Sequence, residues 1–333
     1  MGRYISSLIC SVVFSYLALA NPIERRAISS SLLSTFNLYE QYAAAAYCPA
    51  NNDSPATKLT CTSDACPLVE AADTDTIIEF QNGGITDTTG YLAVDTTNSL
   101  IVLSFRGSES LRNYLVDINF PLTAIDICTG CEGDSGFWQS WSDNRAAILP
   151  SVQSAVASNP SYTVVVTGHS LGGAIATFAA TELRNSGITA TLITFGSPRA
   201  VNPTGAAYIN TQNKGPNYRI THLNDPVPAL PPASFGFEHV DTEYYISSAN
   251  GVAVTTADVQ TCECNEDWVV FDIAAHAWYF NAINEFTDEF TDEFTDEFTD
   301  EFTDEFTDEF TDEFTDEFTD EFTDEFTDEF IDG

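Results

Sequence analysis

Ser170 lies in a short glycine-rich segment whose residue types fit covalent catalysis. The segment reads Gly168-His169-Ser170-Leu171-Gly172 and follows an apolar, largely β-branched run over residues 162–167. A strand that ends in Gly-x-Ser-x-Gly and opens into a helix is typical of a nucleophile elbow, a tight turn that exposes the serine hydroxyl above the sheet edge. Both glycines are expected because the strand and helix backbones pass too close for a Cβ atom. Ser170 is therefore the candidate nucleophile.

A serine nucleophile of this kind needs an acid that follows it in the chain, and then a histidine. Asp225 stands in the turn Asn224-Asp225-Pro226, directly after an expected strand over residues 218–223. An aspartate before proline is also common in ordinary turns, but its place after this strand favours the catalytic role. Asp241 and Asp258 are the alternatives.

The chain has four histidines, and two of them are badly placed to act as a base. His169 adjoins the nucleophile inside the elbow, and His222 lies on the strand before the candidate acid. Between the remaining two, His276 is preferred to His239 because it begins an aromatic segment near the end of the domain, where a triad histidine normally falls.

These three side chains would hydrolyse an ester through an acyl-enzyme. Ser170 attacks the carbonyl carbon, while His276 removes the serine proton and returns it to the leaving alcohol. Asp225 holds the imidazole in the correct tautomer and stabilises its positive charge. The reaction needs no cofactor and no metal.

The developing oxyanion needs hydrogen-bond donors from two segments. The backbone N–H of Leu171 opens the helix behind the nucleophile, and Ser108 follows the expected strand 100–105. One such donor typically stabilises the transition state by about 3 kcal/mol. We therefore assign Leu171 and Ser108 to the oxyanion hole.

Residues 109–120 form a short amphipathic segment directly after Ser108. Four apolar residues with i, i+3, i+4 and i+7 spacing lie on one helical face: Leu111, Tyr114, Leu115 and Ile118. An ordinary surface helix would show the same pattern. Its connection to the oxyanion loop favours a lid that covers the site when closed and meets lipid when open.

The rest of the folded segment alternates strands with helices. Helices are expected over residues 31–47, 136–157, 173–180 and 203–212, and strands over 76–80, 90–95, 100–105, 162–167, 190–195 and 218–223. Pro150 should kink the second helix or divide it in two. The alternation predicts an α/β fold with a mostly parallel central sheet covered on both faces.

The ends of the chain differ from its middle. Residues 1–20 have a basic start, an apolar stretch and a small-residue cleavage site, which predicts a secretory signal peptide and no transmembrane span. Residues 21–26 end in Arg25-Arg26, either a pro-segment cleavage site or a solvated basic pair. Residues 27–284 form the catalytic domain, and residues 285–333 repeat Glu-Phe-Thr-Asp.

The acidic composition limits the classes of partner. The formal net charge is −39, the repeat contains no Lys or Arg, and the folded segment has no basic patch that could hold a nucleic acid. Repelling carboxylates on a four-residue period predict that the tail is disordered. An interaction tail, a calcium-collecting tail and a functionless repeat expansion are the alternatives.

The cysteines fit an oxidising compartment. Two close pairs are expected to form local disulfides, Cys61 with Cys66 and Cys128 with Cys131. Zinc is the alternative for the second pair, but it needs four ligands.

Cys48 is expected to bridge to Cys262 or Cys264, which leaves one thiol over. Asn52 begins the sequon Asn52-Asp53-Ser54 and is the candidate glycosylation site.

Between residues 33 and 280, the sequence resembles the class 3 lipases secreted by filamentous fungi. The segments that carry the resemblance are Phe105–Ser108, Gly168–Ala174, Phe195–Arg199, Arg219–His222, Asn224-Asp225, Leu230–Pro232 and the stretch around His276. The resemblance implies an α/β-hydrolase fold, the triad and oxyanion donors assigned above, a single-helix lid and a hydroxyl bond from Ser108 to Asp117. The family commonly has tryptophan at the position of Tyr114, and a cysteine after the histidine where this chain has the repeat.

We therefore expect a secreted, monomeric carboxylester hydrolase that acts on triacylglycerols at a lipid–water interface. A soluble esterase, such as a feruloyl esterase, and a phospholipase are the alternatives on the same scaffold. A binding protein on an inactive hydrolase scaffold is disfavoured because all triad and oxyanion positions are filled.

Overall fold

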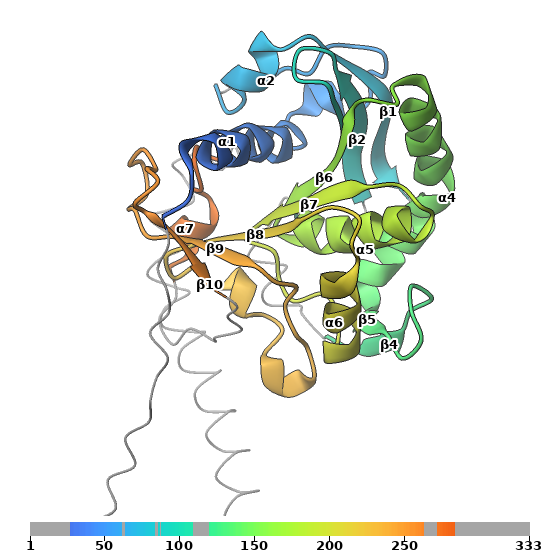
Figure 1. The fold of residues 1–333 in the computed structure, drawn as a ribbon, viewed down its shortest axis with the longest axis vertical. Helices are drawn as coiled ribbons and strands as arrows, with labels where there is room; N and C mark the ends of the chain where they lie inside the picture. Colours follow the sequence, from blue (N-terminus) through green and yellow to red (C-terminus); the bar gives the residue numbers. More distant parts are fainter. Residues whose placement is uncertain are drawn as a thin grey trace, which may run out of the picture.

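An eight-stranded sheet forms the centre of the computed structural model, which describes residues 27–61, 64–83, 86, 88–108, 120–262 and 272–283 (Figure 1). The strand order is β1-β2-β3-β6-β7-β8-β9-β10. The strands are β1 (Thr74–Gly83), β2 (Thr88–Asp95), β3 (Leu100–Phe105), β6 (Thr163–His169), β7 (Ala190–Phe195), β8 (Asn217–His222), β9 (Glu243–Ile246) and β10 (Val259–Cys262). A separate antiparallel pair consists of β4 (Leu122–Ala124) and β5 (Glu132–Asp134).

The middle of the sheet is parallel. Strands β3, β6, β7, β8 and β9 pair in parallel, while β1, β2 and β10 add antiparallel edges. The carboxyl ends of parallel strands meet at one edge, so the loops after β3, β6 and β8 lie near one another. This edge is where the nucleophile, the acid and the oxyanion loop were expected.

Helices cover both faces of the sheet (Figure 1). Helix α1 (Ser30–Ala45) packs on one face, and α4 (Ser135–Ser158) and α5 (Leu171–Asn185) pack on the other. Side chains alternate along β3 accordingly: Val102 joins the α1 core, while Ile101 and Leu103 join the α4–α5 core. The remaining helices are η1 (Pro49–Asn51), α2 (Pro67–Ala71), α6 (Pro203–Thr211), η2 (Val227–Ala229), η3 (Ala233–Phe235) and α7 (Ile273–His276).

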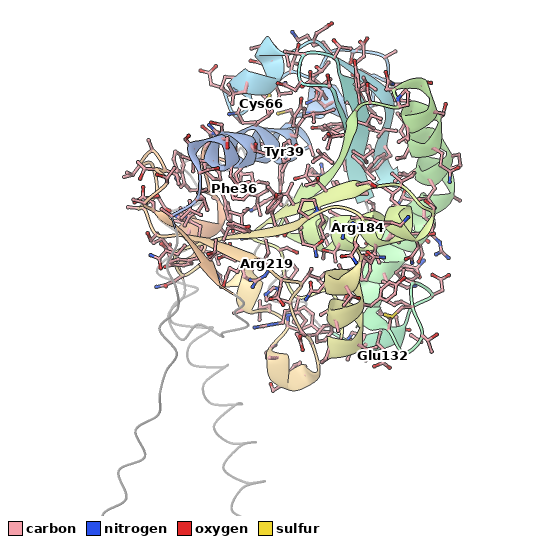
Figure 2. The ribbon with its side chains drawn as sticks, in the orientation of Figure 1. Phe36, Tyr39, Cys66, Glu132, Arg184 and Arg219 are labelled. Carbon is pink, nitrogen blue, oxygen red and sulfur yellow. A yellow bond between two sulfur atoms is a disulfide. The ribbon has the colours of Figure 1, made fainter. Side chains whose placement is uncertain are left out.

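Buried aromatic and charged side chains tie the helices to the sheet (Figure 2). Phe36 of α1 is fully buried and makes edge contacts with Tyr218 and Tyr244, with ring centroids 5.1 and 4.9 Å apart. At the end of α5, the guanidinium of Arg184 donates to the carbonyl oxygens of Ala190 and Pro216. The helix carrying the nucleophile is therefore fixed to β7 and to the entry of β8.

The predicted elements are confirmed, and of the two outcomes expected at Pro150 the structure excludes one. Pro150 does not divide its helix, because α4 runs unbroken over 24 residues. Pro150 and Ala146, whose carbonyl loses its usual partner, are both exposed to water, while Ile148 and Val152 are buried against the sheet. Solvation on one face and packing on the other hold the helix together. The short elements α2, β4, β5, β9 and β10 were not predicted.

Several predicted segments lie outside the described residues. They are the signal peptide and pro-segment (1–26), the lid residues 109–119 and the repeat tail. Where the model describes the chain, none of its helices combines the length and apolar character that crossing a bilayer requires.

Glu40 is a buried carboxyl group between α1 and the end of the domain. It is inaccessible to solvent, and one oxygen accepts a hydrogen bond from Asn281 Nδ2 at 3.0 Å. Burial raises the pKa of Glu40 to about 8, against the smaller opposing effect of the Asn281 bonds. The folded protein therefore binds this proton more tightly than the unfolded chain does.

We expect Glu40 to make stability pH-dependent. Its stabilising contribution is fully present below its unfolded pKa of 4.5 and is lost as pH rises through the folded pKa of about 8. Over that window the free energy of unfolding should fall by up to about 1.4 kcal/mol per pH unit. Urea denaturation at pH 5 and pH 8 measures this fall. The difference in the free energy of unfolding between the two pH values should be smaller in Glu40→Gln than in the parent. An unchanged difference in Glu40→Gln would contradict the assignment.

Candidate active site

Ser170 sits in a strained turn between β6 and α5. Its φ and ψ angles are +56° and −132°, a conformation that a residue with a Cβ rarely adopts. A Cβ at Gly168 would lie 2.3 Å from the Gly172 oxygen, and one at Gly172 would lie 2.2 Å from the Phe105 oxygen. The two glycines are therefore required by backbone proximity, as the sequence predicted.

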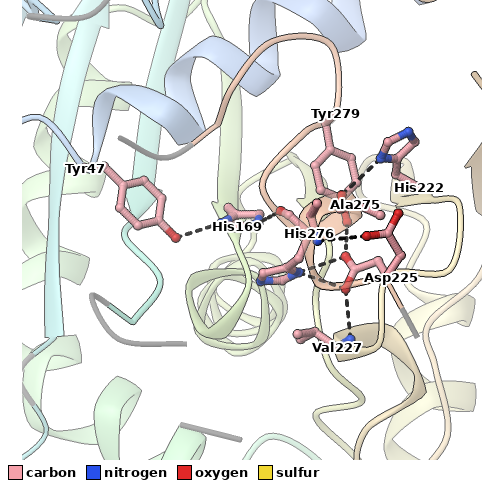
Figure 3. Close-up of polar contacts among 10 residues, drawn as sticks. Tyr47, His169, His222, Asp225, Val227, Ala275, His276 and Tyr279 are labelled. Carbon is pink, nitrogen blue, oxygen red and sulfur yellow. Dashed lines mark hydrogen bonds and ion pairs between the residues drawn. The ribbon is translucent and has the colours of Figure 1, made fainter. Parts of the chain in front are cut away.

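Asp225 follows β8 and is almost completely buried, with 1% exposure. Its carboxylate accepts hydrogen bonds from the Val227 backbone N–H at 2.9 Å and from the Tyr279 hydroxyl at 2.5 Å (Figure 3). Burial, followed by the charge of Asp225, raises the pKa of Tyr279 well above its usual value, so the phenol keeps its proton and donates. The carboxylate is thus held in one orientation.

His276 closes the one-turn helix α7 and faces Asp225. Its Nδ1 lies 2.8 and 2.9 Å from the two carboxylate oxygens (Figure 3). The backbone N–H of Asp272, which caps α7, donates to the Asn224 oxygen at 2.9 Å. The loops of the histidine and the acid are therefore tied together. Because a carboxylate oxygen accepts, Nδ1 carries a proton, which leaves Nε2 as the nitrogen that can exchange a proton with the nucleophile.

The nucleophile and the base both lie close to the end of β7, at Phe195 and Gly196. The Ser170 N–H donates to the Phe195 oxygen at 2.9 Å, and a Cβ at Gly196 would lie 3.0 Å from His276 Cε1 and 2.8 Å from Asp225 Oδ2. Among the described residues, neither Ser170 Oγ nor His276 Nε2 has a hydrogen-bond partner. The bond between them is not formed in this structure, and such bonds often tighten only when substrate is bound.

The loop after β3 lies against the nucleophile. A Cβ at Gly107 would lie 2.9 Å from Ser170 Cβ, so the residue before Ser108 lies directly against the nucleophile. Leu171 is the first residue of α5, so its N–H is one of those without an acceptor inside the helix. Both segments expected to supply oxyanion donors therefore flank Ser170. Asp117 and the four apolar lid residues lie outside the described part of the chain.

The other histidines are occupied elsewhere. His222 contacts the carbonyl oxygens of Ala275 and Ser248 at 3.0 and 2.8 Å, so it braces the loop that carries His276. His239 contacts the Pro228 oxygen at 2.6 Å, and burial, followed by the charges of two arginines, lowers its pKa well below the usual value.

The alternative acids also have other partners. Asp241 accepts from Asn210 Nδ2 at 3.0 Å, and Asp258 accepts from Thr255. The structure brings Asp225 and His276 together at hydrogen-bond distance.

Both local disulfides are present. Cys61–Cys66 closes the loop before α2, and Cys128–Cys131 closes the turn between β4 and β5. Cys48 is buried, with Sγ 3.9 Å from the Ala44 oxygen. The side chain of Cys262 and all of Cys264 lie outside the described residues, so that disulfide stays a prediction.

The glycosylation prediction at Asn52 does not fit the fold. The residue is only 3% exposed, packed at the end of η1, and its Oδ1 is buried. A glycan on this side chain would have to displace the packed loop. A sequon records the acceptor residue types but not their burial, so glycosylation at Asn52 stays a prediction.

Comparison with known proteins agrees with this geometry. A model described as "Lipase (class 3)" matches residues 102–235, and a model of the "Lipase 3 N-terminal region" matches residues 5–76. Secreted mono- and diacylglycerol lipase A of Penicillium cyclopium is 43% identical over 274 residues, covering 79% of this chain and 89% of that protein.

The chain belongs to the class 3 lipase family.

Two further comparisons agree, one with a curated relative and one with a solved structure. The protein is a secreted α/β-hydrolase. Secreted mono- and diacylglycerol lipase 1 of Fusarium solani is 37% identical, covering 78% of this chain and 80% of that protein. A solved structure titled "A serine protease triad forms the catalytic centre of a triacylglycerol lipase" has a TM-score of 0.68 and 30% identity, covering 77% of this chain and 98% of that one. The expected fold class and family are thus confirmed.

Sequence reasoning missed two tyrosines beside the site. Tyr279 follows His276 by three residues, and its place in an aromatic segment was the available signal. Tyr47 is about 120 residues before the nucleophile, so no spacing rule connects it to Ser170. Only the packing of α1 against the sheet brings it to His169.

Proposed function

We propose that this chain is a secreted acylglycerol lipase that uses Ser170, His276 and Asp225 as its catalytic triad. The observation that supports this most strongly is the buried Asp225–His276 pair beside the strained nucleophile elbow. The triad order along the chain and the membership of the class 3 lipase family agree with it.

The proposed reaction proceeds in two balanced halves. Ser170 Oγ bonds to the acyl carbon while its proton passes to His276 Nε2. The resulting oxyanion accepts hydrogen bonds from the backbone N–H groups of Leu171 and Ser108. The ester C–O bond then breaks, and the proton moves from His276 to the leaving glyceride oxygen. Water repeats the sequence on the acyl-enzyme and releases the fatty acid. Asp225 stabilises the imidazolium in both halves.

Mono- and diacylglycerols are the substrates we favour. The relatives at 43% and 37% identity are named for these partial glycerides, whereas relatives named only "Lipase", from Rhizopus and Rhizomucor, are 34% and 32% identical. Triacylglycerols are the second candidate because of the apolar residues in the proposed lid. We further propose that the enzyme works as a monomer at a lipid–water interface.

A substrate panel tests both the reaction and its substrate. Emulsified monoolein, diolein and triolein are compared with phosphatidylcholine and methyl ferulate, using Ser170→Ala as the blank. We expect the partial glycerides to be hydrolysed fastest. A preference for methyl ferulate would indicate a soluble esterase, a preference for phosphatidylcholine would indicate a phospholipase, and no ester hydrolysis at all would refute the proposed function.

A further inference from the structure

A chain of hydrogen bonds runs behind the catalytic residues. The Gly107 N–H contacts the Tyr47 hydroxyl oxygen at 3.1 Å, and this hydroxyl lies 2.7 Å from His169 Nδ1. On the other side of the ring, His169 Nε2 lies 2.8 Å from the backbone oxygen of His276 (Figure 3). The chain thus joins the oxyanion loop to the residue that carries the catalytic imidazole.

The direction of every bond in this chain is fixed by chemistry. The His276 carbonyl can only accept, so His169 Nε2 carries the hydrogen. Burial, followed by the charge of His276, lowers the pKa of His169 well below its usual value, so the ring is neutral and Nδ1 has only a lone pair. Burial likewise raises the pKa of Tyr47. The phenol therefore donates to His169 Nδ1 and accepts from Gly107.

The packing leaves little freedom along this chain. A Cβ at Gly107 would lie 2.2 Å from the Tyr47 hydroxyl and 2.8 Å from the His169 oxygen. The rings of His169 and His276 are 4.4 Å apart, and His169 is itself 1% exposed. Helix α1, the elbow, the oxyanion loop and the histidine loop meet at these few atoms.

We propose that Tyr47 and His169 are positioning residues that hold the oxyanion loop in register with His276. The inference rests on the proposed function. Gly107 directly precedes Ser108, the proposed donor, and the predicted lid begins after it. Within this chain of bonds, the Tyr47 hydroxyl is the group that links the Gly107 N–H to His169 Nδ1. A donor displaced by about 1 Å can cost 10²-fold in rate.

The test uses the full-length enzyme and p-nitrophenyl butyrate, a soluble ester. Tyr47→Phe removes only the hydroxyl, so we expect kcat to fall about 10- to 100-fold with KM changed less than about twofold. Tyr91→Phe is the control, because Tyr91 is a buried tyrosine whose hydroxyl also makes a hydrogen bond, donating to the backbone oxygen of Tyr42 at 2.6 Å. It should lose stability but keep kcat.

Variants of His169 separate positioning from packing. The glutamine side chain has an acceptor oxygen and a donor NH₂ group, which can replace the Nδ1 acceptor and the Nε2 donor of the neutral ring. His169→Gln should therefore retain a higher kcat than His169→Leu. If the residues act as one chain, Tyr47→Phe combined with His169→Leu should be no slower than His169→Leu alone.

The outcomes distinguish this inference from the proposed function. If the parent enzyme does not hydrolyse the ester, or Ser170→Ala hydrolyses it equally well, the proposed function fails. If the parent is active and Tyr47→Phe keeps kcat within twofold, as Tyr91→Phe does, the positioning role is refuted. Additive effects of Tyr47→Phe and His169→Leu on kcat would also refute it.

Discussion

Replacing Ser170 with alanine is expected to lower kcat on p-nitrophenyl butyrate by at least about three orders of magnitude while the protein stays folded. The side chain lies in a tight turn, and its Oγ has no hydrogen-bond partner among the described residues, so its removal breaks no bond seen in the structure. Stability should therefore change little. The comparison requires kcat together with a thermal or urea unfolding curve.

A second buried serine provides the control for this change. Ser104 of β3 is fully buried and donates to the Tyr42 oxygen at 3.0 Å. Ser104→Ala should cost about 1 kcal/mol of stability and leave kcat near that of the parent. Near-normal hydrolysis by Ser170→Ala would refute the nucleophile assignment.

Replacing Asp225 with asparagine should lower kcat by about 10³-fold or more. The change keeps the size of the side chain but removes the charge that stabilises the imidazolium. Donors from Val227, His276 and Tyr279 surround the carboxylate. The NH₂ group of asparagine would therefore face another donor and could not form a hydrogen bond with it. We therefore expect a loss in kcat together with some loss of stability.

Asp258 supplies the matched control for this prediction. It was an alternative acid in the sequence, and its carboxylate accepts from Thr255 at an exposed site. Asp258→Asn should keep the parent kcat. If Asp258→Asn were as slow as Asp225→Asn, or if Asp225→Asn kept full activity, the acid of the triad would have to be reassigned.

Local patterns predicted the positions along the chain at which the site is built. A β-branched strand, two glycines and a helix identified the elbow, because backbone proximity at that turn excludes a Cβ. The strand-turn pattern identified Asp225 because parallel strands end at a common sheet edge. Strand β9 spans only four residues, too few for an alternating pattern to stand out in the sequence.

Local patterns failed where the outcome depends on neighbours distant in sequence. Asn52 carries a valid sequon, but the sequon does not show that the side chain is buried at the end of η1, which disfavours a glycan there. Pro150 resembles a helix breaker, but packing of Ile148 and Val152 keeps α4 continuous. In both cases tertiary contacts outweigh the local preference of the residue.

The order of residue types along the chain was sufficient to determine the α/β fold class, the elbow and the identity of the candidate acid and base. These features follow from short-range sterics and from strand and helix periodicity, which any stretch of sequence records. The tertiary structure alone decided which groups surround the triad: Tyr279 on Asp225, and Tyr47 and His169 between the oxyanion loop and His276. The longest of those contacts joins residues 122 positions apart. No local rule encodes them, because they depend on how α1 and the last loop pack against the same sheet edge.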